Sequence, residues 1–435
     1  MKKVMGFWRC WGLVVGMMIG NGIFMLPAVL APYGRLSLLG WVVGGIGTIF
    51  IALMLGMLTR RKAMLGGPYA YTRAAFGDFS GFLIGWAYWI ALLTAIAAGA
   101  LATTGYIGFF IPGVVENPVI SASVSLLFIW LITGINVVGV KTASTFQLIT
   151  SLIKLLPLFL IVAGGLFIGD VANTTSSITQ SEPTYFVLAE IVMIIMWSYL
   201  GVECVTCPAD DMIEPEKNIP RAMIFGTLTV TAVYILVTYS VMALIPTEDL
   251  ANSTAPIADA ASVIFGPWGA GFIAIGGLIS IISAISANVF VVGVMPQALA
   301  QDNLVPQKFA QLNKGGAPAI AIIVSGIIAS LLIVMNFSEG LMGAFKTLIL
   351  LSTLATLLPY VGSALAELAM QKRDRKKGIK TNWGSFGIAL AALLFTIFAL
   401  IGSGLMIVLQ GTVLLAAGLP LYFWSKRKNA MQESE

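Results

Sequence analysis

The stretch GMMIGNGIFMLP, residues 16–27, places a Gly-Asn-Gly sequence in the middle of the first long apolar segment of the chain. The sixth apolar segment contains IIMWSYLGVECVTCP, residues 194–208, with Gly201 near its middle. Glycine and asparagine favour non-helical backbone. Unwound backbone at the middle of a membrane is tolerated only where it lines a cavity or is buried in protein. We therefore expect two interrupted transmembrane helices that form a binding site together; close helix packing through small residues is the alternative interpretation.

The rest of the chain has the composition of a membrane protein. Of 435 residues, 58% are hydrophobic and 10% are charged, and the mean hydropathy is +0.96, which soluble globular domains do not reach. Because apolar runs long enough to cross a bilayer recur from end to end, we predict an all-α polytopic membrane protein with twelve transmembrane helices. The predicted spans are 8–31, 36–58, 79–111, 118–140, 144–168, 185–209, 222–245, 266–300, 318–336, 342–370, 383–403 and 406–425.

The basic residues predict the orientation of these spans. With the N-terminus inside, all of the 24 lysines and arginines except Arg35, Lys154 and Lys346 fall on the cytoplasmic side, as the positive-inside rule requires. We therefore expect both termini in the cytoplasm. The net charge of +5 is then explained by basic loops that face an anionic leaflet, and it does not call for a nucleic-acid partner.

The two interruptions lie five helices apart, in the first and sixth spans. An odd number of spans gives the second copy of a repeat the opposite topology, so this spacing predicts a 5+5 inverted repeat. We expect the first repeat over 1–168, the second over 169–370, and two further helices with a cytoplasmic tail over 371–435. Substrate would bind between the half-helices, where free N–H groups and a helix N-terminus suit an anionic group such as a carboxylate.

Lys154 lies in the otherwise apolar run SLIKLLPLFLIVAGGLFIG, residues 151–169. A lysine at the centre of a membrane costs roughly 2.5–3.5 kcal/mol on insertion scales, so a lysine that is kept there marks an ion or substrate pathway. The alternative, a side chain that reaches back to the interface, is weakened by the several residues that separate Lys154 from either end of the run. We expect Lys154 to belong to a coupling site.

Several motifs in the same order resemble those of the amino acid–polyamine–organocation (APC) transporters, over roughly residues 8–425. The matching pieces are GNGIFMLPA (20–28), GGPYAYTRAAFG (66–77), WSYLGVE (197–203), EPEKNIPRA (214–222) and QDNLVPQKFAQLNKGGAP (301–318). The resemblance implies a LeuT-like fold in which helices 1 and 6 are broken. It also implies an amino acid transporter that works by alternating access, and bacterial permeases and antiporters are the nearest members.

The resemblance also implies a substrate site. Gly20, Asn21 and Gly22 would hold a substrate carboxylate through backbone amides, although the usual middle residue in the family is serine. The unwound part of the sixth helix, which would receive the amino group, corresponds to Ser198, Leu200 and Gly201.

Four further residues match gating and coupling positions of the family. Trp197 matches the aromatic residue that closes over substrate, and Tyr88 and Tyr69 match positions of the outer and inner gates. Packing is the alternative role for Trp197, because aromatic residues are common in membrane helices. Glu203 matches a glutamate just past the break, which would pair with a basic group, hold backbone N–H groups or titrate.

For Lys154 the resemblance implies a mechanism. In proton-coupled members, a lysine of helix 5 lies where sodium-coupled relatives bind the ion that ties helix 1 to helix 8. Hydroxyl groups that would face this lysine come from Ser280, Ser283 and Ser286 on helix 8. We therefore expect Lys154, together with Glu203, to couple transport to protons or to hold the site static in an exchanger.

The substrate class is predicted from two positions. In antiporters of cationic substrates, a tryptophan of helix 8 and an asparagine of helix 3 contact the cationic side chain, and Asn288 and Ile96 stand there in this chain. The cation–π surface and the polar contact are lost, and no acidic residue is evident at the site. We therefore expect a neutral amino acid, with basic amino acids or polyamines as the alternative.

Other classes of protein fit less well. The chain contains no histidine and no nucleophile–base arrangement, so we expect neither an enzyme nor a metal or other cofactor. Cys204 and Cys207 form a C-x-x-C pair that we interpret as small buried residues, with metal or redox chemistry as the alternative. A channel would show rings of charged residues, and an amino acid sensor on a transporter scaffold would carry a larger cytoplasmic domain. The expected location is the bacterial inner membrane, where the last two helices would offer a face for a homodimer.

Overall fold

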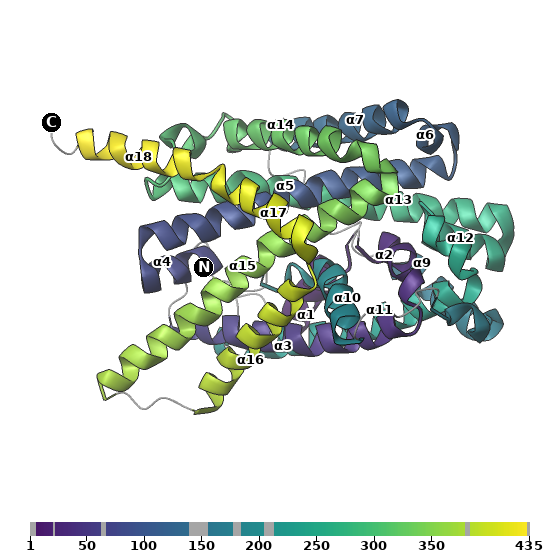
Figure 1. Cartoon of the computed structure of the whole chain (residues 1–435), viewed down its shortest axis with the longest axis horizontal. Coiled ribbons are helices and arrows are strands. Elements are labelled where there is room, and N and C mark those ends of the chain that lie inside the picture. Colours follow the sequence, from purple (N-terminus) through teal and green to yellow (C-terminus); the bar gives the residue numbers. More distant parts are fainter. Residues whose placement is uncertain are drawn as a thin grey trace.

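The protein is described by a computed structural model that covers residues 6–20, 22–61, 67–138, 155–176, 184–203, 213–378 and 383–432. Within these ranges the backbone is helical, with short 3₁₀ turns and no strand. Most of the long helices run side by side along the long axis of the molecule, and α15 crosses them obliquely (Figure 1).

Nine helices of the described part are long and apolar enough to cross a membrane. Each overlaps one of the predicted spans, so the prediction of an all-α polytopic membrane protein is confirmed. These helices are α3 (Leu36–Arg61), α5 (Asp78–Gly108), α7 (Pro118–Val138), α11 (Pro215–Leu244), α13 (Pro256–Gln301), α14 (Ala319–Asn336), α15 (Gly340–Lys376), α16 (Trp383–Ile401), and α17 (Gly404–Ala416) continued by α18 (Leu419–Gln432).

The other three predicted spans contain shorter or interrupted helices. The first holds α1 (Phe7–Met18) and α2 (Gly22–Leu30), which are bent by 46° at a break where the sequence predicted one. The fifth and sixth hold α9 (Leu155–Ile168) and α10 (Thr184–Tyr199), and both border residues outside the described ranges. α10 ends two residues before Gly201, where φ is +101°, a conformation that glycine adopts without the strain that a Cβ would bring.

Short helices occupy segments that the sequence predicted as loops. They are η1 (Ala31–Tyr33), α4 (Pro68–Phe76), α6 (Gly113–Glu116), η2 (Val171–Thr174), α12 (Thr247–Asn252), η5 (Gln307–Ala310) and η6 (Phe337–Glu339). α13 also begins ten residues before the predicted span, because a helical stretch precedes a kink at Gly266, where φ is +67°. The predicted start of that span therefore coincides with the kink.

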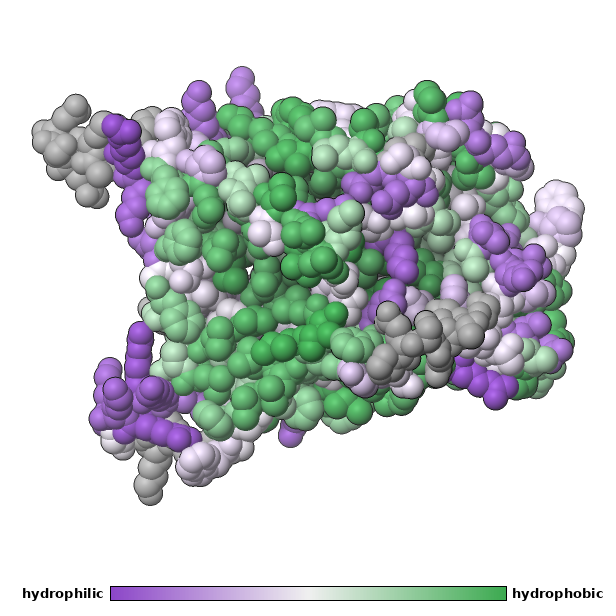
Figure 2. All heavy atoms as spheres, viewed as in Figure 1, coloured by the Kyte–Doolittle hydropathy of each residue, from purple (hydrophilic) through white to green (hydrophobic). Residues whose placement is uncertain are grey.

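The centre of the bundle is formed by α5 and α15. In each, 83% of the apolar window is buried, compared with 22% in α16 and 17% in the window that runs from α17 into α18. Because α16 and α17 keep apolar side chains on the surface, they lie at the periphery. Figure 2 shows hydrophobic side chains across the middle of one face, with hydrophilic side chains gathered towards both ends, as expected for a protein that crosses a bilayer.

One end of the bundle, here called the basic end, carries the ends of α3 and α15 and also α4 (Figure 1). The start of α1 and the end of α18, the first and last described helices, also lie towards this end. Its basic residues include Arg60, Arg61, Arg73, Lys372, Arg373, Arg375 and Lys376.

Candidate functional site

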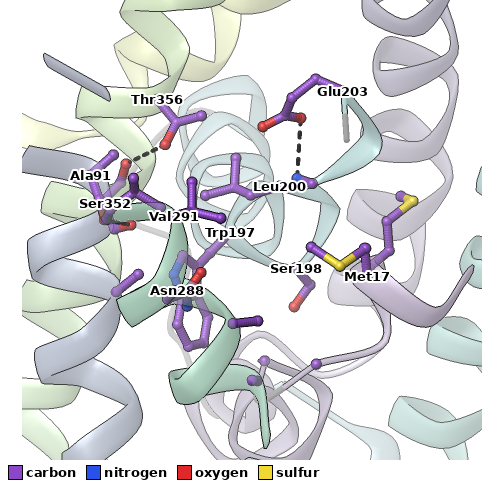
Figure 3. Close-up of a pocket in the computed structure, with 18 of the residues that line it drawn as sticks. Met17, Ala91, Trp197, Ser198, Leu200, Glu203, Asn288, Val291, Ser352 and Thr356 are labelled. Atoms are coloured by element: carbon purple, nitrogen blue, oxygen red, sulfur yellow. Dashed lines mark hydrogen bonds between the residues drawn. The ribbon is translucent and has the colours of Figure 1, made fainter. Parts of the chain in front are cut away.

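A cavity of about 100 Å³ lies where the break between α1 and α2 and the end of α10 meet α5, α13 and α15. It brings together most of the residues that the sequence singled out, from both breaks and from three other helices (Figure 3). Its lining is formed by Gly16, Met17, Met18, Gly20, Gly22, Tyr88, Ala91, Leu92, Ala95, Trp197, Ser198, Leu200, Gly201, Glu203, Ala284, Ala287, Asn288, Val291, Ser352 and Thr356.

The break between α1 and α2 contributes backbone to this wall. The N–H of Gly20 donates to the carbonyl of Met18 at 2.8 Å. Gly22 lies directly against the end of α10, since a Cβ built there would be 2.1 Å from Ser198 Oγ. The Ser198 hydroxyl is buried and has no hydrogen-bond partner among the described residues, so it offers the cavity a polar group. Asn21 lies outside the described residues.

The two interrupted helices are tied together by a residue that the sequence reasoning missed. The hydroxyl of Tyr234, on α11, is 2.6 Å from the carbonyl oxygen of Met18 and 3.1 Å from that of Ser198. These carbonyls belong to the ends of α1 and α10, which lose intrahelical partners where a helix stops. The fully buried side chain of Tyr234 therefore keeps the end of α1 next to the end of α10.

Glu203 places a carboxylate in the wall of the cavity. It is 6% exposed, and its oxygens accept hydrogen bonds from Tyr88 Oη (3.1 Å), Tyr360 Oη (2.8 Å) and the N–H of Gly201 (3.1 Å). An ionised carboxylate can accept from all three donors at once. Among the described lining residues, Glu203 is the one carboxylic acid. The expectation of a site without an acidic group therefore does not hold.

Trp197, two residues before the end of α10, also lines the cavity (Figure 3). Its ring is 6% exposed and meets Phe345 edge to face, with ring centroids 5.5 Å apart. Asn288 of α13 lines the cavity as well (Figure 3). Ile96 is buried but is not among the lining residues, whereas the preceding residue, Ala95, is.

The sequence reasoning also missed a hydroxyl-bearing face on α15. Ser352 and Thr356 line the cavity, and Tyr360 reaches Glu203 one turn further along the helix. Ser352 donates to the carbonyl of Ala91 on α5 at 2.8 Å, which fixes the two central helices against each other. The signal was present in the sequence, because polar residues at spacing i, i+4 and i+8 share one face of a helix.

Tyr69 lies away from the cavity, at the basic end. Its hydroxyl donates to Asp302, which follows α13, and Asp302 also pairs with Arg73 of α4 at 2.6 Å. Arg73 in turn contacts Asp78 at 2.8 Å. Two effects raise the pKa of the Tyr69 hydroxyl: burial, which is the larger, and the hydrogen bond to Asp302. These four side chains connect α4, the start of α5 and the end of α13.

The proposed coupling site is described only in part. Lys154, Cys204 and Cys207 lie outside the described residues. On α13, Ser286 accepts a hydrogen bond from Asn136 Nδ2 at 3.3 Å, and the hydroxyl of Ser280 is buried with no partner among the residues that the structure describes.

Apolar helices long enough to span a membrane surround a central cavity, and its wall contains the bent pair of α1 and α2 and the end of α10; this arrangement is that of a membrane transporter. The chain belongs to the amino acid permease family, whose model matches residues 5–421, within the APC superfamily. The resemblance that the sequence motifs indicated is thereby confirmed, and the protein is an integral membrane protein of a family of transporters.

Several relatives match over nearly the whole chain. The putrescine transporter PotE of Escherichia coli K12 is 27% identical over 409 residues, which cover 93% of this chain and 92% of PotE. The arginine/ornithine antiporter of Pseudomonas aeruginosa is 28% identical over 439 residues, covering 96% and 89%. A putative arginine/ornithine antiporter of Bacillus subtilis is 28% identical over 439 residues, covering 92% of each chain.

Proposed function

We propose that this protein is a secondary transporter that exchanges basic amino acids or polyamines across the bacterial inner membrane by alternating access. The observation that carries the proposal is the carboxylate of Glu203 in the wall of the central cavity. A cationic ammonium or guanidinium group beside this carboxylate would gain both Coulomb attraction and a charge-assisted hydrogen bond. The names of the relatives, a putrescine transporter and two arginine/ornithine antiporters of which one is putative, support the same class.

This proposal replaces the earlier expectation, based on Asn288 and Ile96, that the substrate is a neutral amino acid. Ile96 does not line the cavity, so its apolar character does not bear on the substrate directly. The aromatic residues around the cavity, Trp197 and Tyr88, would supply the faces on which a cation can rest. The absence of a tryptophan at position 288 is thus compatible with a cationic substrate.

The carboxylate of an amino acid substrate would lie at the other interruption. Gly22 begins α2, whose first backbone N–H groups lack helical partners, whereas the N–H of Gly20 already donates to the carbonyl of Met18. The hydroxyl of Ser198, which is buried and has no partner among the described residues, adds a donor next to Gly22. A diamine has no carboxylate, so its binding would depend on Glu203 more strongly than that of arginine or ornithine.

The finer architecture is also part of the proposal. Nine long helices, one bent pair and the two shorter apolar helices α9 and α10 support twelve spans in a 5+5 inverted repeat. The concentration of arginine and lysine at the basic end supports a cytoplasmic location for that end and for both termini. Tyr69 would then act in an inner gate, Tyr88 and Trp197 in an outer gate, and Lys154 and Glu203 in proton coupling.

Exchange measured in proteoliposomes tests the proposal. Vesicles loaded with arginine, ornithine or putrescine should take up the labelled cationic substrates faster than any neutral amino acid. Glu203→Gln should lower this exchange about tenfold or more, since a hydrogen bond to a charged group contributes about 1.5–3 kcal/mol. Glu190→Gln is the matched control, because Glu190 pairs with Lys346 at 3.3 Å and lies outside the cavity lining.

The assay separates the alternatives. Faster exchange of neutral amino acids would reject a cationic substrate and restore the first expectation. Ligand-induced thermal stabilisation without any uptake would favour a sensor. Exchange by the Glu203→Gln variant at the rate of the unaltered protein would show that substrate binding does not require the carboxylate of Glu203.

A further inference from the structure

An open groove of about 640 Å³ lies at the basic end, between the start of α1 and the start of α11. It is separate from the central cavity, with which it shares no lining residue. The groove is lined by Phe7, Trp8, Trp11, Arg221, Phe225 and Thr229.

Aromatic rings form most of the groove. Phe7 meets Trp8 and Phe225 edge to face, with ring centroids 5.1 and 6.0 Å apart, and Trp8 meets Trp11 at 5.9 Å. The indole N–H of Trp11 donates to Thr229 Oγ1 at 3.3 Å, which fixes α1 on α11. Yet Trp8 is 74% exposed and Phe225 is 54% exposed, so much of this ring surface faces outward.

The one charged side chain in the described lining is Arg221. It is exposed, lies one turn before Phe225 on α11, and makes no hydrogen bond or ion pair with the part of the chain that the structure describes. By contrast, the guanidinium of Arg375 at the same end lies 4.2 Å above the ring of Trp383. A free guanidinium presents a planar set of donors that matches a phosphate group.

We propose that this groove binds an anionic phospholipid, with the phosphate on Arg221 and the glycerol and upper acyl chains against Trp8 and Phe225. Tryptophan rings at the end of a membrane span are characteristic of the headgroup level, and Arg221 lies one turn after Lys217, the first residue of the candidate span of α11. Basic pockets between membrane helices on the cytoplasmic side suit anionic headgroups. A free phosphate ion would use Arg221 but not the exposed rings.

The lipid would act on the cavity through α1. α1 connects the groove to the cavity, since Trp11 lines the groove while Gly16, Met17 and Met18 line the cavity within two turns of it. A lipid wedged between α1 and α11 would stabilise one position of α1. The inference does not depend on which substrate the cavity binds.

Quenching of tryptophan fluorescence by brominated lipids tests the proposal. The full chain is placed in nanodiscs of phosphatidylcholine that contain either dibromo-phosphatidylglycerol or dibromo-phosphatidylcholine at equal fraction. The anionic lipid should quench more strongly, and high salt should weaken this preference. Arg221→Gln should reduce the preference about fivefold, the factor that corresponds to about 1 kcal/mol per basic residue at an anionic surface. Trp8→Phe should remove most of the excess quenching.

Two controls isolate the groove. Lys217→Gln removes the same charge one turn earlier on α11, where Lys217 pairs with Glu214 at 3.1 Å, and should keep the preference. Arg221→Lys should also keep most of the preference for the anionic lipid. That result would show that a loss in Arg221→Gln is caused by the missing charge and not by misfolding. Equal quenching by the two lipids in the unaltered protein would overturn the proposal. A preference for the anionic lipid that Arg221→Gln leaves intact would also overturn the proposal. The same holds if the preference appears only after residues 1–5 are deleted, because the chain's own N-terminus, and not a lipid, would then occupy the groove of the full chain.

Discussion

Replacing Gly22 by alanine tests whether the two interrupted helices meet as closely as the structure shows. The new Cβ would lie 2.1 Å from Ser198 Oγ, 3.2 Å from Ser198 Cβ and 3.4 Å from the ring of Trp197. Rotation of the serine hydroxyl relieves the first overlap but not the second. Overpacking of this kind costs about 1–3 kcal/mol, so we expect Gly22→Ala to lower thermal stability and to slow exchange.

A double-mutant cycle with Ser198→Ala makes the prediction specific. The Ser198 hydroxyl has no partner among the described residues, so its removal alone should cost little stability. In the double variant the closest overlap is gone, and stability should return towards that of Ser198→Ala, with a coupling energy of about 1 kcal/mol or more. Gly20→Ala is the control for stability, because a Cβ there would meet Ala284 at an ordinary 3.7 Å.

The assay is thermal unfolding of the unaltered protein and the four variants in detergent, followed by exchange in proteoliposomes. The close contact between α2 and α10 is refuted if Gly22→Ala unfolds at the same temperature as the unaltered protein. It is also refuted if the effects of the two substitutions on stability simply add in the double variant.

Three further predictions concern backbone strain, the buried carboxylate and a hydroxyl at the basic end. Gly201→Ala should destabilise the protein by about 1–2 kcal/mol, because φ is +101° and a Cβ is disfavoured there; Gly134→Ala, which meets open space, should not. Tyr360→Phe removes one donor from Glu203 and should cost about 1–3 kcal/mol of stability, measured by chemical unfolding; no change would contradict that hydrogen bond. Because the pKa of Tyr69 is raised, the stability that its proton contributes is present below the ordinary value near 10 and lost as pH rises above it. Thermal stability should therefore fall more steeply above that pH in the unaltered protein than in Tyr69→Phe, and parallel profiles would contradict this.

Much of the architecture is readable from local sequence. Hydropathy alone locates the spans, because a bilayer demands about 20 apolar residues per helix. Glycine at positions 20, 22 and 201 marks the breaks, since it needs no neighbour to favour unwound backbone. The motifs of residues 66–77 and 197–203 then indicate the family, which the match over residues 5–421 confirms.

The chemistry of the cavity was decided by tertiary structure. Tyr88 and Tyr360 reach Glu203 from positions 115 and 157 residues away, and Tyr234 joins two carbonyls from separate breaks. Ile96, predicted to line the site, lies outside the lining. These outcomes depend on the rotation of each helix about its axis. In a bundle where the central helices are apolar on nearly all faces, hydropathy does not specify that rotation; the packing of α5 against α15 does.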